Sequence, residues 1–320
     1  MRTILVPTDF SECASHALAS ACRIACRLDS EIILLHVISG AEGGLPVNGT
    51  GQWNETISSE QVPFMMKFLK ETKRKMLRLA STPEFRSIRI KDVVETGDVV
   101  KTIRAASVKY GAQAIVMGTH GTKGLNDIFM GSTASRVVRD ADIPVISIRD
   151  GSIRKISNIV FATDFSDEAN LVFPFIRSFA EAFGANIHLL KILVDFDISG
   201  LNAEKRKGQQ FEYENNISYP VQIIHHMRSK EEGIRRFAGM VGADLIAIGT
   251  HGRHGLARFF KGSLAEDVVN HAALPVLTVN FHRKLLEQQH RLDEETARAM
   301  REAAKGNTIY SMPQSSPIIT

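Results

Sequence analysis

Two glycine-spaced segments hold the residues with the clearest chemical potential in this 320-residue sequence. The first reads GTHGTKGLNDIFMGS at 118–132, and the second reads GTHGRHGLARFFKGS at 249–263. Glycines let main-chain amides approach a ligand closely, and a helix starting at each Gly-Ser pair adds unpaired N–H groups with a partial positive charge. The serine can cap that helix and also donate to a phosphate oxygen. The spacing therefore predicts two phosphate-binding loops.

The alternative interpretation is that each loop is only a turn between a strand and a helix, kept similar by duplication. A single loop of this kind would favour that interpretation. The same spacing of three glycines and a hydroxyl in two loops instead favours an anion site. His120 and His251 lie between glycines without an identifiable acidic partner or nucleophile. We therefore expect local hydrogen bonds from them, and we predict no catalytic residue.

The loops belong to a longer internal repeat, which indicates a duplicated domain. Three matches occur in the same order: ILVPTDFSE at 4–12 with IVFATDFSD at 159–167, AQAIVMGTHG at 112–121 with ADLIAIGTHG at 243–252, and ADIPVISI at 141–148 with AALPVLTV at 272–279. We predict domains at residues 1–150 and 152–281, followed by a helical or disordered tail at 282–320. The tail helix either lies on the surface or binds a partner.

Each copy reads as alternating strands and helices around a parallel sheet. Its strands are continuous apolar runs, which is typical of strands buried on both faces. The fold class predicted is α/β, with two tandem doubly wound, Rossmann-like parallel-sheet domains. Copy one has a helix-like stretch near 64–80 after its second strand, whereas copy two has only a brief polar connection near 200–216.

Ligands of such sheets bind at the carboxyl ends of the strands, where the strand order reverses. Both GTHG segments begin where a strand ends, and Asp9 and Asp164 close the first strand of each copy. A carboxylate repels phosphate, so each aspartate is expected away from the phosphate end of a ligand. The alternative role is a helix cap, supplied by Asp9 or Ser11.

The spacing G-x2-G-x9-G-[ST], with an early strand ending in Asp, resembles the ATP-binding class of the universal stress protein family. The resemblance covers nearly the whole chain except the tail. It implies the adenine-nucleotide α-hydrolase-like type of fold and ATP, with or without Mg²⁺, as the ligand.

The resemblance also implies a role for each matching residue. Asp9 and Asp164 would contact the adenosine, the main chains of Val37 and Ile192 the adenine, and Gly118 and Gly249 the ribose. The predicted phosphate cradle consists of Gly121, Gly131, Ser132, Gly252, Gly262 and Ser263. The predicted nucleotide-binding set also includes Pro7, Thr133 and Leu264.

The copies differ at the edge of the predicted pocket. Copy one has Gly97 after its third strand, and the matching residue in copy two is Arg228, which either binds phosphate or fills the pocket. His225 and His226 are adjacent on a strand and point to opposite faces, so no metal site is predicted. Nucleotide binding is expected more strongly in copy one.

Composition limits the partners and the compartment. The net charge is +4 without a block of like charges, which does not indicate nucleic acid. No apolar run is long enough for a membrane span, and the N-terminal run is too brief for a signal peptide. Cys13, Cys22 and Cys26 form no paired framework, so we interpret them as helix packing residues in a reducing, cytoplasmic compartment.

The resemblance implies a cytoplasmic stress-response sensor or regulator, with at most weak ATPase or autophosphorylation activity and an unidentified regulatory protein partner. It also implies that the last strands, PVISI and PVLTV, pair in an intrachain pseudo-dimer or in a homodimer. One alternative is a nucleotide-independent dimerising scaffold. Another is a nucleotidyl-transfer enzyme, but PTDFSE stands where such enzymes usually place a Ser-Gly-Gly-rich loop.

Overall fold

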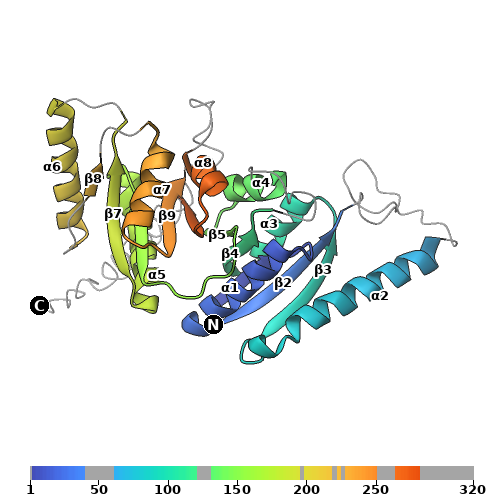
Figure 1. Ribbon diagram of the computed structural model, residues 1–320. Coiled ribbons are helices and arrows are strands. Elements are labelled where there is room, and N and C mark those ends of the chain that lie inside the picture. The colour runs from blue at the N-terminus through green and yellow to red at the C-terminus, as the bar shows by residue number, and fades with distance from the viewer. Residues whose placement is uncertain are drawn as a thin grey trace, which may run out of the picture.

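The computed structural model describes residues 2–39, 61–120, 131–194, 198–217, 222–224, 228–250 and 264–281. Their strands form one ten-stranded sheet in the order β3-β2-β1-β4-β5-β10-β9-β6-β7-β8, and the two copies lie side by side along it (Figure 1). All described strand pairs are parallel except β5 with β10. The predicted α/β class with two tandem Rossmann-like copies is confirmed.

Copy one follows the predicted order of elements closely. Its elements are β1 (Arg2–Pro7), α1 (Glu12–Leu28), β2 (Ser30–Ile38), α2 (Gln61–Ala80), a 3-10 turn (Pro83–Phe85), β3 (Ile90–Thr96), α3 (Val99–Lys109), β4 (Ala112–Gly118), α4 (Ser132–Asp140) and β5 (Val145–Ile148).

Copy two repeats this order with one difference from the prediction. Its elements are β6 (Asn158–Ala162), α5 (Asp167–Phe183), β7 (Asn186–Ile192), α6 (Ile198–Glu214), β8 (Gln222–Ile224), α7 (Lys230–Met240), β9 (Leu245–Thr250), α8 (Leu264–His271) and β10 (Val276–Asn280). The expected brief polar connection near 200–216 is wrong, because α6 occupies it. Phe211 anchors this polar helix by packing against Phe165 and Phe173 in the core.

The sheet is buried on both faces, as the continuous apolar strands predict. Along β1, Ile4 and Val6 belong to the core cluster that includes α1 and α5, whereas Leu5 belongs to the cluster that includes α3, α4, α7 and α8. Adjacent strand residues point to opposite faces, so a continuous apolar strand supplies both cores.

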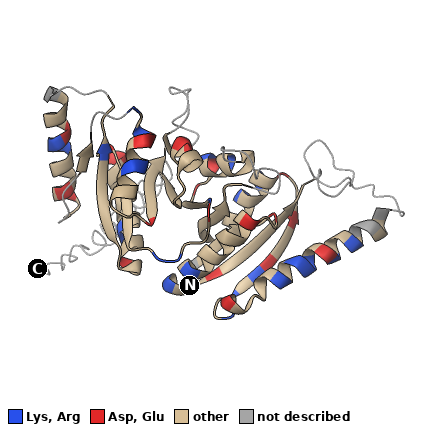
Figure 2. Ribbon diagram, in the orientation of Figure 1, with Lys and Arg blue, Asp and Glu red and all other residues tan. Residues whose placement is uncertain are grey.

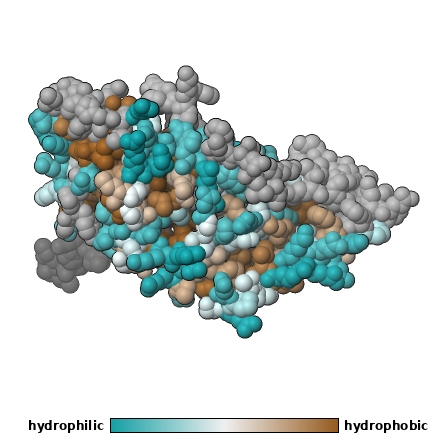
Figure 3. All heavy atoms as spheres, in the orientation of Figure 1, coloured by the Kyte–Doolittle hydropathy of each residue, from teal (hydrophilic) through white to brown (hydrophobic). Residues whose placement is uncertain are grey.

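Helix α2 lies on β3 as an amphipathic helix, which confirms the helix expected near 64–80. Thr72 and Met76 are buried, while the exposed side is rich in lysine and arginine. That side is hydrophilic in the face shown in Figure 3. Elsewhere basic and acidic residues are interleaved over both copies (Figure 2). Among the described helices, none has the length and apolarity to cross a membrane.

The two copies join at an antiparallel seam between β5 and β10, where Leu277 pairs with Ile146. A pseudo-twofold pair of contacts flanks it: Asn280 Nδ2 donates to the Ala141 carbonyl at 3.2 Å, and Arg149 donates to the Asn270 carbonyl. The predicted pairing of the last strands is thus confirmed within one chain. Both strands have neighbours on both sides in the described sheet, so neither offers a free edge to a second chain.

Candidate functional site

The strand order reverses once within each copy. From β1 the chain proceeds to β2 and β3 on one side and then to β4 and β5 on the other, so the reversal lies between β1 and β4. In copy two it lies between β6 and β9. Loops leave in opposite directions at such a point and open a crevice at the carboxyl ends of the strands. Asp9 and Gly118 flank this crevice in copy one.

The Thr-Asp-Phe-Ser turn after β1 is held by its own side chains. Thr8 Oγ1 accepts from the Phe10 amide at 3.1 Å, and Asp9 Oδ1 accepts from the Ser11 amide at 3.0 Å. Phe10 has a positive φ of 65°, a strained conformation that these bonds stabilise. Ser11 Oγ accepts from the Ala14 amide and caps α1. The sequence left open whether Asp9 or Ser11 caps the helix. The structure shows that Ser11 caps it, while Asp9 stabilises the turn.

Copy two repeats this turn bond for bond. Thr163 Oγ1 accepts from the Phe165 amide at 3.1 Å, Asp164 Oδ1 accepts from the Ser166 amide at 3.1 Å, and Ser166 caps α5. Phe165 has a φ of 60°. The duplication therefore preserved the backbone geometry of the strand end as well as its sequence.

The ends of β2 and β7 lie beside these turns. His36 Nδ1 is 2.8 Å from the Thr8 carbonyl oxygen, and the His36 ring lies 4.5 Å from the Phe10 ring. The side chains of Val37 and Ile192 are buried in the core. Only their main chains are then suited to a ligand, in keeping with the main-chain contact that the resemblance implies.

Gly118 has a packing role that the sequence did not reveal. A Cβ at this position would lie 2.8 Å from Cys13 Sγ and 2.9 Å from the Cys13 carbonyl carbon, in the first turn of α1. Side chains do not tolerate such approaches to backbone, so glycine is needed for α1 to reach the end of β4. Cys13 Sγ lies 3.1 Å from the Ile148 carbonyl oxygen, a contact that fixes this turn near β5.

Gly131 brings the end of β4 and the start of α4 together. Its amide donates to the Thr119 carbonyl at 2.8 Å, and it is the N-cap residue of α4. Ser132, Thr133 and Ser135 follow in the first turn, which contains no acidic residue. His120, expected to bond locally, has Nδ1 2.8 Å from Thr119 Oγ1. The four predicted cradle residues Gly121, Gly252, Gly262 and Ser263 lie outside the described residues, as do His225, His226 and His251.

Copy two contains an aromatic ring where copy one has none. The Phe281 ring lies directly against Gly249, so that a Cβ there would overlap it, and its side chain is 7% exposed. Arg228, by contrast, is exposed. Sequence reasoning missed Phe281 because it stands after the last repeated strand, where copy one has Asp150.

A partly buried ion pair adjoins the turn of copy two. Lys191 Nζ donates to the Asp164 carbonyl at 3.2 Å and pairs with Glu204 of α6 at 3.2 Å. Lys207 also pairs with Glu204, at 2.8 Å. Burial raises the pKa of Glu204, but the hydrogen bond from Lys207 and the charge of Lys191 lower the pKa by more, so it lies below its ordinary value of 4.5. The cluster ties α6 to the end of β7.

We expect Glu204→Gln to lower the free energy of unfolding by about 1–3 kcal/mol at pH 7. A carboxylate with a lowered folded pKa contributes stability above its unfolded pKa and loses it as the pH falls through the folded pKa. The difference between variant and wild type should therefore shrink below about pH 4.5. Urea unfolding at pH 7 and at lower pH measures it, with exposed Glu84→Gln as the control. A difference that persists in acid would contradict this electrostatic role.

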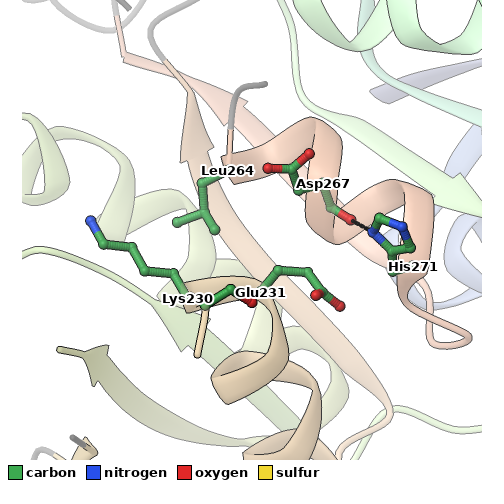
Figure 4. A pocket seen from close by; sticks show the side chains of 6 residues that line it. Lys230, Glu231, Leu264, Asp267 and His271 are labelled. Carbon is green, nitrogen blue, oxygen red and sulfur yellow. Dashed lines mark hydrogen bonds between the residues drawn. The ribbon is translucent and has the colours of Figure 1, made fainter. Parts of the chain in front are cut away.

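A hollow of about 270 Å³ lies between α7 and α8 of copy two (Figure 4). Its lining mixes charges: Ser229, Lys230, Glu231, Leu264, Asp267 and His271. The carboxylates of Glu231 and Asp267 make it unsuited to phosphate. In copy one, Arg136 occupies the place of Asp267 and approaches Asp98 at 3.9 Å. No group of three potential metal ligands occurs among the described residues.

The comparison with known proteins divides the chain into the same two copies. The model of the universal stress protein family matches residues 1–149 and 155–280. A universal stress protein of Methanocaldococcus jannaschii is 29% identical over 153 residues, covering 46% of this chain and 94% of that protein. A universal stress protein of Mycolicibacterium smegmatis is 23% identical over 296 residues, covering 86% of this chain and 96% of that protein.

The fold comparison extends over both copies. The crystal structure of a universal stress protein from Archaeoglobus fulgidus superimposes with a TM-score of 0.66 at 21% identity, covering 87% of this chain and 98% of that one. The similarity therefore includes the tandem arrangement. The chain belongs to the universal stress protein family.

Proposed function

We propose that this chain is a cytoplasmic stress-response regulator that binds ATP at the carboxyl edge of its sheet, with copy one as the main site. The observation that carries the proposal is the junction at Gly131, where the end of β4 meets an α4 N-terminus that contains hydroxyls and no acid. Unpaired amides and the helix dipole favour phosphate at such a place.

The nucleoside end of the proposed site lies across the crevice from α4. Pro7 ends β1, Asp9 lies in the ordered turn, and Val37 offers main-chain groups near the end of β2. Ser11 Oγ lies 3.5 Å from the His120 carbonyl oxygen, so the turn adjoins the loop after β4. Adenine and ribose at this end and phosphates at Gly131, Ser132 and Thr133 would satisfy both charge preferences. Mg²⁺ would enter with the phosphates of the nucleotide.

Regulation is proposed in preference to efficient catalysis. Asp9 Oδ1 accepts from the Ser11 amide, and His120 Nδ1 lies within hydrogen-bond distance of Thr119. A general base must be within reach of the proton that it removes, and Asp9 Oδ1 and His120 Nδ1 are engaged in holding the loops. Hydrolysis or autophosphorylation would accordingly be slow. A homodimer would require a surface other than β5 and β10, and the regulatory partner would read the nucleotide state.

The test is to denature the purified full-length chain, identify any released nucleotide by chromatography and mass spectrometry, and titrate the stripped protein with ATP by calorimetry. GTP serves as the matched control, since it presents the same triphosphate on a different base. Saturable binding of ATP in preference to GTP is the expected result. If no nucleotide is released and ATP does not bind, the proposal is rejected in favour of the dimerising scaffold.

A further inference from the structure

We propose that the chain binds a single nucleotide, in copy one, and that the packing of Phe281 against Gly249 and the carboxylates near the start of α8 keep copy two from binding a second. This inference rests on the proposed function and specifies its stoichiometry. It follows from three differences between the described parts of two copies that otherwise share their strand order and their Thr-Asp-Phe-Ser turns.

The first difference is which residues cover the glycine at the end of β4 in copy one and of β9 in copy two. In copy one, the first turn of α1 lies against Gly118, with Cys13 in contact. In copy two, the Phe281 ring covers Gly249 and belongs to the same core cluster as Phe165 of the adjacent turn. Helix α5 also packs less closely on β9 than α1 packs on β4. An apolar ring thus stands beside the glycine predicted for the ribose.

The residue that matches Phe281 in copy one is Asp150, whose side chain is 72% exposed. A buried aromatic ring contributes a large apolar area to the core, whereas an exposed carboxylate contributes none. The repeat therefore differs in which residue packs beside the glycine predicted for the ribose: Phe281 in copy two and Cys13 in copy one.

The second difference is the charge at the start of the last helix. In α4 the first turn carries only small and hydroxyl side chains, followed by Arg136. In α8, the first described turn carries Glu266 and Asp267, which match Ser135 and Arg136 of α4. Carboxylates at a helix N-terminus satisfy the dipole themselves and repel an incoming phosphate. Glu231 of α7 adds a further carboxylate to the adjoining hollow (Figure 4).

The third difference is at the nucleoside end. Lys191 of β7 donates to the Asp164 carbonyl and pairs with Glu204, so α6 is tied to this end of the crevice. The matching residue in copy one is His36, which approaches the Thr8 carbonyl without an ion pair to α2 among the described contacts. At the glycine, at the start of α8 and at the nucleoside end, copy two therefore makes contacts with its own side chains.

The first experiment uses the wild-type chain and 8-azido-ATP, a photoreactive probe, followed by peptide mapping. Labelling confined to peptides from 1–150 with one ATP per chain by calorimetry is the expected result. Two ATP per chain, or labelling of 152–281, would overturn the inference while leaving the proposed function intact. No binding at all would instead reject the proposed function, so the two failures are distinguishable.

The second experiment restores the features of copy one to copy two. The variant Phe281→Asp combined with Glu266→Ser and Asp267→Arg is expected to raise the stoichiometry from one to two ATP. Phe281→Leu keeps an apolar side chain and serves as the matched variant, expected to remain at one. Circular dichroism verifies folding, and if Phe281→Asp unfolds the chain, Phe281→Ala replaces it in the combination. A folded combined variant that still binds one ATP would overturn the role of Phe281.

Discussion

Gly131→Val is expected to weaken ATP binding by at least about 100-fold, a loss of about 2.7 kcal/mol of binding free energy. Gly131 begins α4 at the proposed phosphate position, and its amide bonds to Thr119. A branched side chain there would occupy the space that the phosphates need. Calorimetric titration of the stripped variant with ATP measures the loss.

The variant should remain folded, which makes the result interpretable. Gly131 has a φ of −57°, which any residue adopts, and a Cβ would lie 3.3 Å from the Thr119 oxygen, a tight contact that a small shift relieves. Gly239→Val is the matched control, because a Cβ at Gly239 in α7 meets nothing within 4 Å. Unchanged ATP affinity in a folded Gly131→Val chain would remove Gly131 from the phosphate site.

The repeat made much of the fold predictable. Continuous apolar runs predicted the strands, and Ser11, one of the two cap candidates, does cap α1. The pairing of the last strands followed from the family resemblance and is confirmed by the seam between β5 and β10. These features depend on local sequence patterns, or on a family topology that the motifs identify, so a single sequence is enough to predict them.

The missed features depend on contacts between distant segments. Helix α6 has a mostly polar sequence, and its position is decided by Phe211 meeting Phe165 and Phe173 across 38 residues or more. Phe281 is the last residue of the predicted second domain, and no sequence pattern indicates that its ring packs against Gly249. Tertiary packing overrides local propensity in such cases.

Gly118 illustrates a second kind of ambiguity. Its place in the glycine motif predicts a ligand contact, yet the close approach of Cys13 requires a glycine there without any ligand. A motif residue can therefore serve packing and binding together, and sequence alone does not separate them. Gly131 lacks such a clash, which makes it the better probe of binding.

Phe173→Ala is expected to lower the free energy of unfolding by about 3–5 kcal/mol, the usual cost of removing a buried phenylalanine. Phe173 is 2% exposed and lies 5.9 Å from the ring of Phe161 and 5.4 Å from that of Phe211. Urea denaturation measures the change. Phe175→Ala, on the partly buried side of the same helix, is the matched control and should cost clearly less.

The same substitution also tests how α6 is held. If Phe173 and Phe211 anchor α6 together, their alanine variants should be non-additive, with a coupling energy of about 0.5–3 kcal/mol. Once one ring is lost, the other no longer has its partner, so its removal costs less in the second step. Additivity within about 0.5 kcal/mol would mean that α6 docks through other contacts, such as Lys191 with Glu204. ATP affinity should survive in the folded single variants, because the proposed site lies in copy one and these rings lie in copy two.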